Sequence, residues 1–224
     1  MSKLPILFFI LISQIVFSQN VFLNKVEKTN SNNDKHLYLL SENIHQAEYL
    51  GEIEVQGFSD NDADVFSAIY KKAKDIGANS YTIKPFETID GSNSKFDSRH
   101  YRLNLYYLNK DLYWKKNGAL YIFASSAKNQ KIAINKKDYI LSPRSYLSIP
   151  VIAGEVYTIS TKKIFGSTIK FQVKNQSTSY YFKATSSNIK ADDSGVGGLN
   201  LKSGDIIGLE ESFGDFLRTI YSKP

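Results

Sequence analysis

The sequence predicts an α+β protein in which a small βαββ domain is followed by an all-β sandwich domain. Two patterns predict this fold class: one strong amphipathic helix signal in the first half, and a series of short alternating stretches at near-regular spacing in the second. The composition agrees, because 42% hydrophobic and 22% charged residues in 224 is an ordinary globular balance. The chain has no cysteine, which excludes disulfides, thiolate metal sites and a cysteine nucleophile.

The first 18 residues have the layout of a secretory signal peptide. Lys3 supplies a positive charge, residues 4–17 are almost wholly apolar, and the small Ser18 ends the run. This run is shorter than the roughly 20 residues that a membrane-crossing helix needs. We therefore expect cleavage after Ser18, a periplasmic or secreted destination, and no stable membrane insertion of the mature chain. The alternative is an uncleaved membrane anchor.

The next segments are a polar N-terminal stretch at residues 19–35 and the first domain at residues 36–108. The Asn-rich part of the stretch, residues 29–35, is typical of a linker or a frayed terminus. The first strand of the domain is predicted near residues 49–55, where apolar and charged side chains alternate. Two further strands are predicted, with bounds of 80–83 and 102–108.

A helix is predicted between these strands. Ser59 or Asp60 is placed to cap its start, and Gly77 stands where the left-handed residue that ends many helices is wanted. Apolar side chains recur at intervals of four, four and three residues and form one face. These side chains are Val65, Ile69, Ala73 and Ile76.

Residues 49–53 (YLGEI) and 73–80 (AKDIGANS) resemble a short motif of a known family. It is the small α+β domain of bacterial envelope and stress proteins that includes the Rcs outer-membrane sensor lipoprotein and the YbjQ-like group. The motif residues are expected to be structural: Gly77 as helix stop, Ala78 as the small residue between helix and sheet, and Asn79 as a local side-chain-to-backbone cap. Gly51 belongs to the same motif. Because this chain lacks cysteine, neither lipid attachment, signalling nor metal binding carries over.

The sandwich domain is predicted at residues 113–221. Its strands are expected at 118–123, 131–134, 138–141, 146–151, 156–160, 169–173 and 179–184. Residues 135–137 form a hairpin-length turn, and Pro150 indicates an edge strand. Apolar residues at the end of the chain predict a short amphipathic helix packed on the sandwich or on the first domain. They are Phe213, Phe216, Leu217 and Ile220.

The order of elements in this half resembles a sandwich domain of unknown function from bacterial lipoproteins, related in outline to PEGA-type modules. The resemblance is carried by an aromatic first strand, a short hairpin, a third strand, a Gly turn and a strand with an aromatic pair. These segments are residues 120–123, 132–137, 146–149, 153–157 and 180–182. The resemblance implies a binding or spacer module of the cell envelope and brings no catalytic residue.

The sequence predicts no catalytic residue, no metal site and no cofactor. His36, His45 and His100 lack the spacing of zinc ligands. The stretch 192–198, with two aspartates and three glycines, lacks the ordered ligand series of a calcium loop, so a hairpin turn is the preferred interpretation.

The positive charge is concentrated in one stretch. Residues 110–144 hold eight basic and two acidic side chains, and the stretch also contains aromatic residues. The preferred interpretation of this stretch is solvated lysines on exposed strand faces and edges. The functional alternative is an anionic partner, and a glycan or envelope surface rather than nucleic acid because the chain is expected to be exported. The expected binding residues are Trp114, Lys115, Lys116, Tyr121, Lys136, Lys137 and Arg144.

Together these patterns predict a secreted, non-enzymatic binding or structural module of the bacterial cell envelope that engages an envelope protein or an anionic glycan. One alternative is an extracytoplasmic hydrolase that uses loop residues near Asp192 or His100. Another is a component of an envelope stress sensor.

Overall fold

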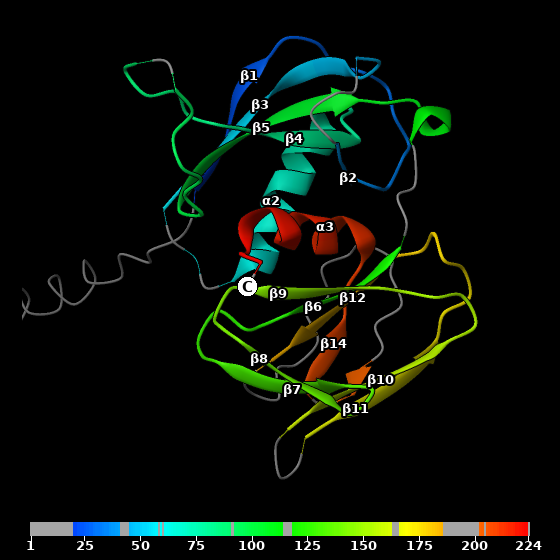
Figure 1. Cartoon of the computed structure of the whole chain (residues 1–224). Helices are drawn as coiled ribbons and strands as arrows, with labels where there is room; N and C mark the ends of the chain where they lie inside the picture. Colours follow the sequence, from blue (N-terminus) through cyan, green and yellow to red (C-terminus); the bar gives the residue numbers. More distant parts are fainter. Residues whose placement is uncertain are drawn as a thin grey trace, which may run out of the picture.

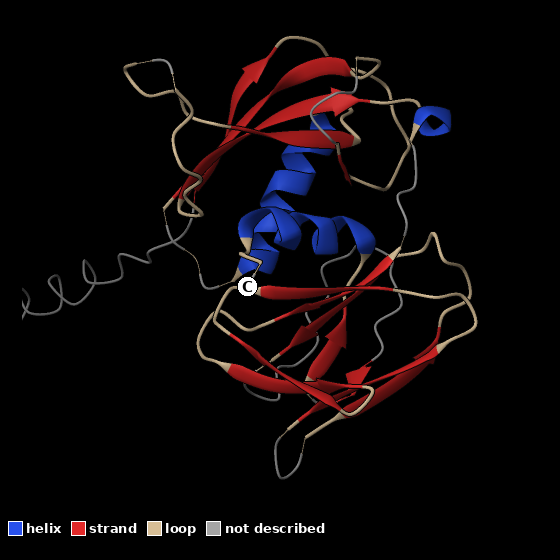
Figure 2. Cartoon of the chain, viewed as in Figure 1, coloured by secondary structure: helices blue, strands red, loops and turns tan. Residues whose placement is uncertain are grey.

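The computed structural model describes residues 20–40, 45–57, 59, 61–90, 92–113, 118–162, 166–185, 202, 203 and 205–223. The predicted signal peptide lies outside these residues. The described chain is an α+β structure of mostly β character, with three sheets and two α-helices (Figures 1 and 2). The two helices lie between the sheet of the first half and the sandwich of the second (Figure 2).

The first half is built on a five-stranded sheet of order β1-β3-β5-β4-β2. Its strands are β1 (Asn20–Val26), β2 (Tyr38–Leu39), β3 (Glu48–Gln56), β4 (Ser80–Lys84) and β5 (His100–Tyr107). The pairs are antiparallel except β2 with β4. Alternation along β3 and β5 buries Ile53, Val55, Leu103 and Leu105 on one face and leaves charged side chains on the other.

Helix α2 (Asp62–Asp75) covers the apolar face of this sheet. Val65, Ile69 and Ala73 are buried, as the sequence periodicity predicts. The cap differs from expectation, because Asn61 is the N-cap and its side-chain oxygen accepts a hydrogen bond from the backbone N–H of Ala63 at 3.2 Å. Any short polar side chain can accept this bond, so the sequence allowed several starting points.

Residues 20–35 pack on the first domain, and the expectation of a linker or frayed terminus at residues 29–35 is wrong. Part of this segment is strand β1, and the rest packs on the C-terminal end of α2. The backbone N–H of Asn30 donates to the carbonyl of Ile76 at 3.0 Å, and the side-chain amide of Asn32 donates to the carbonyl of Gly77 at 3.0 Å. The Lys74 ammonium donates to the carbonyls of Asp34 and His36 at 2.7 and 2.6 Å. The Asn-rich sequence therefore satisfies polar groups at a helix end.

The two glycines of the motif at residues 49–53 and 73–80 lie where the backbone leaves no room for a side chain. Gly77 has φ of +80°, and a Cβ there would lie 1.8 Å from the carbonyl oxygen of Asn30. A Cβ on Gly51 would lie 2.2 Å from the carbonyl oxygen of Lys25, where β1 and β3 are both irregular in register. Both glycines thus permit β1 and the following segment to approach the helix and sheet.

The other two motif residues are buried where the helix meets the sheet. Ala78 is fully buried. The Asn79 side chain donates to the carbonyl of Leu108 at 2.7 Å and accepts from the N–H of Leu108 at 2.8 Å. The expectation of a local cap is therefore corrected: Asn79 ties the start of β4 to the chain that leaves β5, 29 residues away.

The second half is a sandwich of two sheets, of order β11-β10-β7-β8 and β13-β14-β12-β6-β9. The first sheet consists of β7 (Gln130–Ile134), β8 (Lys137–Leu141), β10 (Val156–Thr161) and β11 (Thr168–Gln172). The second consists of β6 (Ala119–Phe123), β9 (Tyr146–Pro150), β12 (Tyr180–Ala184), β13 (Lys202–Ser203) and β14 (Ile206–Gly208). Each predicted strand is present, and Pro150 lies on the edge strand β9. The short β13 and β14 were not expected.

Helix α3 (Glu211–Ile220) joins the halves (Figure 1). Phe216 and Leu217 are fully buried. On one side the ring of Phe216 lies 5.3 Å from the ring of Phe66 in α2, and on the other the helix packs on Tyr181 of β12. One hydrophobic cluster therefore extends from the first sheet across both helices to the near face of the sandwich. The predicted amphipathic helix packs on both domains at once.

Candidate functional site

Of the residues that the sequence predicts as one basic and aromatic site, the four that the structure describes do not converge. Trp114, Lys115 and Lys116 lie outside the described residues. Tyr121 faces the helices, where its ring stacks on Tyr181 at 5.1 Å.

The remaining predicted residues lie on separate surfaces. Arg144 is turned toward the first domain, as described next. Lys136 is in the turn between β7 and β8, and Lys137 begins β8 with its ammonium over the ring of Tyr139. For the four described residues, the expectation of one contiguous site is corrected, because sequence neighbours in a sandwich alternate between its two faces.

Arg144 belongs to a buried cluster of charges between the domains. Its guanidinium lies 2.8 Å from a carboxylate oxygen of Asp62, the first residue of α2. The hydroxyl of Tyr221 donates to the other oxygen at 2.7 Å, and the ammonium of Lys183 lies 3.8 Å from it. Asp62 is only 2% exposed. This carboxylate thus connects the start of α2 with two cations of the sandwich and with the chain end.

A second buried carboxylate fixes α3 to the sandwich. Asp215 of α3 accepts a hydrogen bond from the hydroxyl of Tyr181 at 2.9 Å and from the guanidinium of Arg218 at 2.6 Å. That guanidinium lies 4.6 Å from the centre of the Tyr121 ring. Arg144, Tyr121 and Arg218 are therefore engaged inside the protein, and these contacts connect its domains.

Burial raises the pKa of Tyr181 and Tyr221, and the neighbouring carboxylates of Asp215 and Asp62 raise each further. Burial likewise raises the pKa of Tyr38 to about 12. Unfolded phenols ionise near pH 10. Above that pH the unfolded chain loses protons that the folded chain retains, so these groups stabilise the fold fully below pH 10 and less as the pH rises.

We expect the free energy of unfolding, obtained from urea titrations, to fall between pH 10 and 11 with a slope of about 1 kcal/mol per pH unit for each of the buried phenols of Tyr181 and Tyr221. Tyr221→Phe should reduce that slope by the contribution of one phenol. Circular dichroism at a series of pH values measures both. A midpoint that stays constant from pH 9 to pH 11 would contradict the assignment.

His100 meets a titratable partner, but on an open surface. Its Nε2 lies 2.7 Å from a carboxylate oxygen of Glu54, and the hydrogen bond from His100 is the largest of the effects that lower the pKa of this carboxyl. The pair lies on the sheet face opposite α2, where the His100 side chain is 47% exposed. In the part of the chain that the structure describes, no group of three or more His, Asp or Glu side chains is placed to hold a metal ion. The loop near Asp192 lies outside that part.

A group of accessible cations lies on the outer face of the β11-β10-β7-β8 sheet, which is the sandwich face farthest from the helices (Figure 1). Strand alternation directs Lys131, Thr158, Ser160 and Lys170 outward, while their neighbours are buried in the sandwich. A shallow depression of about 410 Å³ lies on this face. It is lined by Ala133, Asn135, Lys136, Thr158, Ser160 and Lys162.

The depression has a rigid floor and cationic walls. Ala133 and Ser160 are cross-strand partners, and the depression exists because their side chains are small. Asn135 and Lys136 form a two-residue turn with φ of 47° and 72°. The backbone N–H and side-chain oxygen of Asn135 bond Thr158 at 2.9 and 2.8 Å, which fixes the turn against β10. The second wall is Lys162, which pairs with Asp138 at 3.0 Å.

Of the predicted binding residues within the described ranges, Lys136 alone lines this depression. Lys162 and Lys170 lie outside residues 110–144, so the local charge count missed them. The signal available in the sequence was the alternation along β10, which places the small hydroxylated Thr158 and Ser160 on the outer face and leads to Lys162.

None of the described helices is long and apolar enough to cross a membrane. Comparison of the chain with protein-family models, with curated proteins and with solved structures found no match.

Proposed function

We propose that this protein is a non-catalytic binding module that holds an anionic polysaccharide on the outer sheet of its sandwich domain. The observation that carries the proposal is the depression between Lys136 and Lys162, with the small and hydroxylated side chains of Ala133, Thr158 and Ser160 as its floor. Lys131 and Lys170 extend the positive charge along the same face.

The shape and chemistry of this face suit an extended polymer with repeated negative charges. Each exposed ion pair contributes only about 0.2–1 kcal/mol. A polymer that meets several lysines on one chain gains avidity from their combination. Hydroxyl groups of Thr158 and Ser160 can bond sugar hydroxyls or carboxylates between the lysines. Because the strands hold these groups in place, little conformational freedom is lost on binding.

The envelope is the proposed compartment. The signal-peptide layout of residues 1–18 supports export. The resemblance of both halves to envelope modules supports the same location and a binding or spacer role. Anionic polysaccharides are abundant on the outside of cells, whereas nucleic acid is not the expected partner there.

The test is binding to a linear polyuronate, polygalacturonate, with neutral dextran as the control polymer. We expect wild-type protein to bind polygalacturonate but not dextran, and to lose affinity as NaCl rises from 50 to 300 mM because the exposed charges are screened. The triple variant Lys136→Gln, Lys162→Gln, Lys170→Gln should bind about threefold to a hundredfold more weakly, from three lost pairs at about 0.2–1 kcal/mol each. Isothermal titration calorimetry measures each constant.

The matched control removes three exposed lysines from the first half of the chain: Lys35→Gln, Lys71→Gln and Lys95→Gln. It changes the net charge by the same amount and should keep wild-type affinity within about twofold. Equal losses in the two triple variants would show that net charge, not this face, governs binding. No binding by the wild-type protein, or equal binding to dextran, would contradict the proposal.

A further inference from the structure

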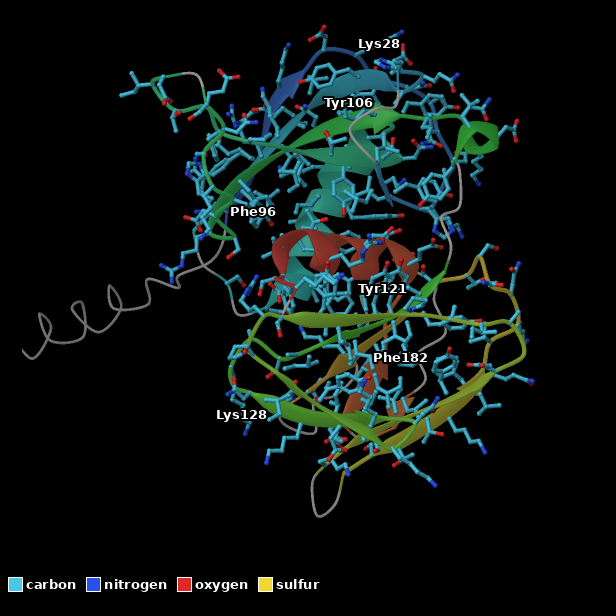
Figure 3. All side chains as sticks on the ribbon, viewed as in Figure 1. Lys28, Phe96, Tyr106, Tyr121, Lys128 and Phe182 are labelled. Carbon is cyan, nitrogen blue, oxygen red and sulfur yellow. The ribbon has the colours of Figure 1, made fainter. Side chains whose placement is uncertain are left out.

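A second groove lies at the mouth of the sandwich, between the edge strand β11 and the strands β12 and β14. Phe171 of β11 faces two rings of β12: its ring centre lies 5.0 Å from that of Tyr180 and 5.3 Å from that of Phe182. Figure 3 shows Phe182 between the two sheets. The groove has a volume of about 480 Å³, within the range of small-molecule sites.

The aromatic floor of this groove is partly open and well fixed. Phe171 and Tyr180 are half-buried, whereas Phe182 is 5% exposed and belongs to the core behind them. The hydroxyl of Tyr180 accepts a hydrogen bond from the backbone N–H of Lys174 at 3.2 Å, which sets the orientation of the ring. The floor therefore presents ring surface to an incoming molecule without needing to rearrange.

The rim of the groove is polar but carries no net charge. One cation, Lys174, and one carboxylate, Glu211, belong to it, and Gln172, Thr178 and Ser179 offer amide and hydroxyl groups. Gly208 and Leu209 also line the groove, and the Gln172 amide donates to the carbonyl of Gly154 at 3.0 Å. An apolar floor inside a neutral rim of donors and acceptors favours a molecule with the same division of its surface.

We propose that this groove binds an uncharged sugar ring of a polysaccharide or oligosaccharide. A pyranose has C–H groups on its flat faces, which pack on aromatic rings, and hydroxyl groups around its edge, which can bond Gln172, Ser179 and Thr178. A plain alkyl chain would cover those rim groups without bonding them, which is unfavourable. An anionic sugar gains nothing here, because Lys174 and Glu211 offset each other.

This site is separate from the basic face and does not rest on the function proposed for it. The basic face is the outer surface of the β11-β10-β7-β8 sheet, whereas the aromatic groove opens between the two sheets. Neutral sugars and polyanions therefore test different residues, and either proposal can be contradicted without affecting the other.

The test uses three neutral hexasaccharides, cellohexaose, maltohexaose and chitohexaose, with the wild-type chain. Saturation-transfer NMR should show transfer from the protein to the pyranose protons of at least one hexasaccharide. Intermolecular NOEs should connect that sugar with the aromatic protons of Phe171 and Tyr180. Calorimetry should show at least about tenfold weaker binding by Phe171→Leu and by Tyr180→Leu, because leucine retains the apolar volume without a flat ring. Thermal unfolding verifies that each variant is folded.

Two controls complete the design. Tyr180→Phe keeps the ring and should bind within about threefold of wild type, and the triple variant of the basic face should bind like wild type. The proposal is overturned if no hexasaccharide gives NOEs to these rings, or if Tyr180→Phe and Tyr180→Leu lose affinity equally. Binding of octanoate without binding of any sugar would identify an acyl-chain groove instead and would also overturn it.

Discussion

Asp62→Ala is expected to lower the free energy of unfolding by about 3–5 kcal/mol. The carboxylate of Asp62 is 2% exposed and pairs with Arg144 at 2.8 Å and with Lys183 at 3.8 Å. Its removal leaves two positive charges in a buried interface, and it also leaves the Tyr221 hydroxyl without its acceptor. The penalty comes mainly from those uncompensated groups, and the loss of the attraction itself is the smaller part.

Urea unfolding followed by circular dichroism measures this effect, and Asp64→Ala is the matched control. Asp64 occupies the same first turn of α2 but is exposed. Its loss removes a similar interaction with the helix dipole, worth about 0.3–1 kcal/mol. If Asp62→Ala costs no more than Asp64→Ala, the buried cluster does not stabilise the protein. A double variant of Asp62→Ala with Arg144→Met should be less destabilised than the sum of the two, because one unpaired cation is removed with its partner.

The same cluster predicts that the wild-type domains unfold in one transition. Asp62 comes from the first domain, Arg144 and Lys183 come from the sandwich, and Tyr221 follows the helix that packs between them. The hydrophobic cluster around α3 includes residues of both halves. In Asp62→Ala the two halves lose this polar connection. Coincidence of the unfolding curves recorded by near- and far-UV circular dichroism shows whether they still unfold in one transition.

Much of the fold could be read from local sequence patterns, and the exceptions have physical reasons. Burial on one side of an element produces a periodic pattern of apolar residues in the sequence. The sandwich strands show this as alternation, and α2 shows it as the four-four-three spacing of Val65, Ile69, Ala73 and Ile76. Strand β1 shows little of this pattern, because it is an edge strand in which only Val21 and Leu23 are even half-buried. The short β14 pairs through three residues, too few for a period to show.

The candidate site was less predictable, because local composition does not say which side of a sheet a residue faces. Arg144 and Lys136 are eight positions apart, yet one is engaged with Asp62, 82 positions before Arg144, and the other is at the rim of the outer depression. Two of the cations that join Lys136 on the outer face come from distant parts of the chain: Lys162 follows β10, and Lys170 lies in β11. Strand pairing sets this grouping, and pairing is a property of the whole domain.

Gly214→Ala is the substitution for which helix propensity and packing predict opposite signs. Gly214 lies within α3, where alanine is favoured over glycine by about 1 kcal/mol. A Cβ at this position would lie 2.3 Å from Cδ1 and 2.4 Å from Cγ of Tyr181. That ring is 5% exposed, and its hydroxyl is bonded to Asp215, so it has no free direction in which to move. We therefore expect a net loss of about 1–3 kcal/mol of unfolding free energy, measured by urea unfolding.

The cause can be separated from a general intolerance of α3 by changing the other partner. In a Tyr181→Leu background the ring is gone, so Gly214→Ala should cost little or should stabilise the helix by up to about 1 kcal/mol. A difference of this kind between the two backgrounds would show that the close approach of α3 to β12 requires glycine at position 214. An equal loss in both backgrounds would contradict the packing argument. The absence of a side chain at Gly214 is then what allows α3 to contact the sandwich on one side while Phe216 packs on Phe66 of α2 on the other.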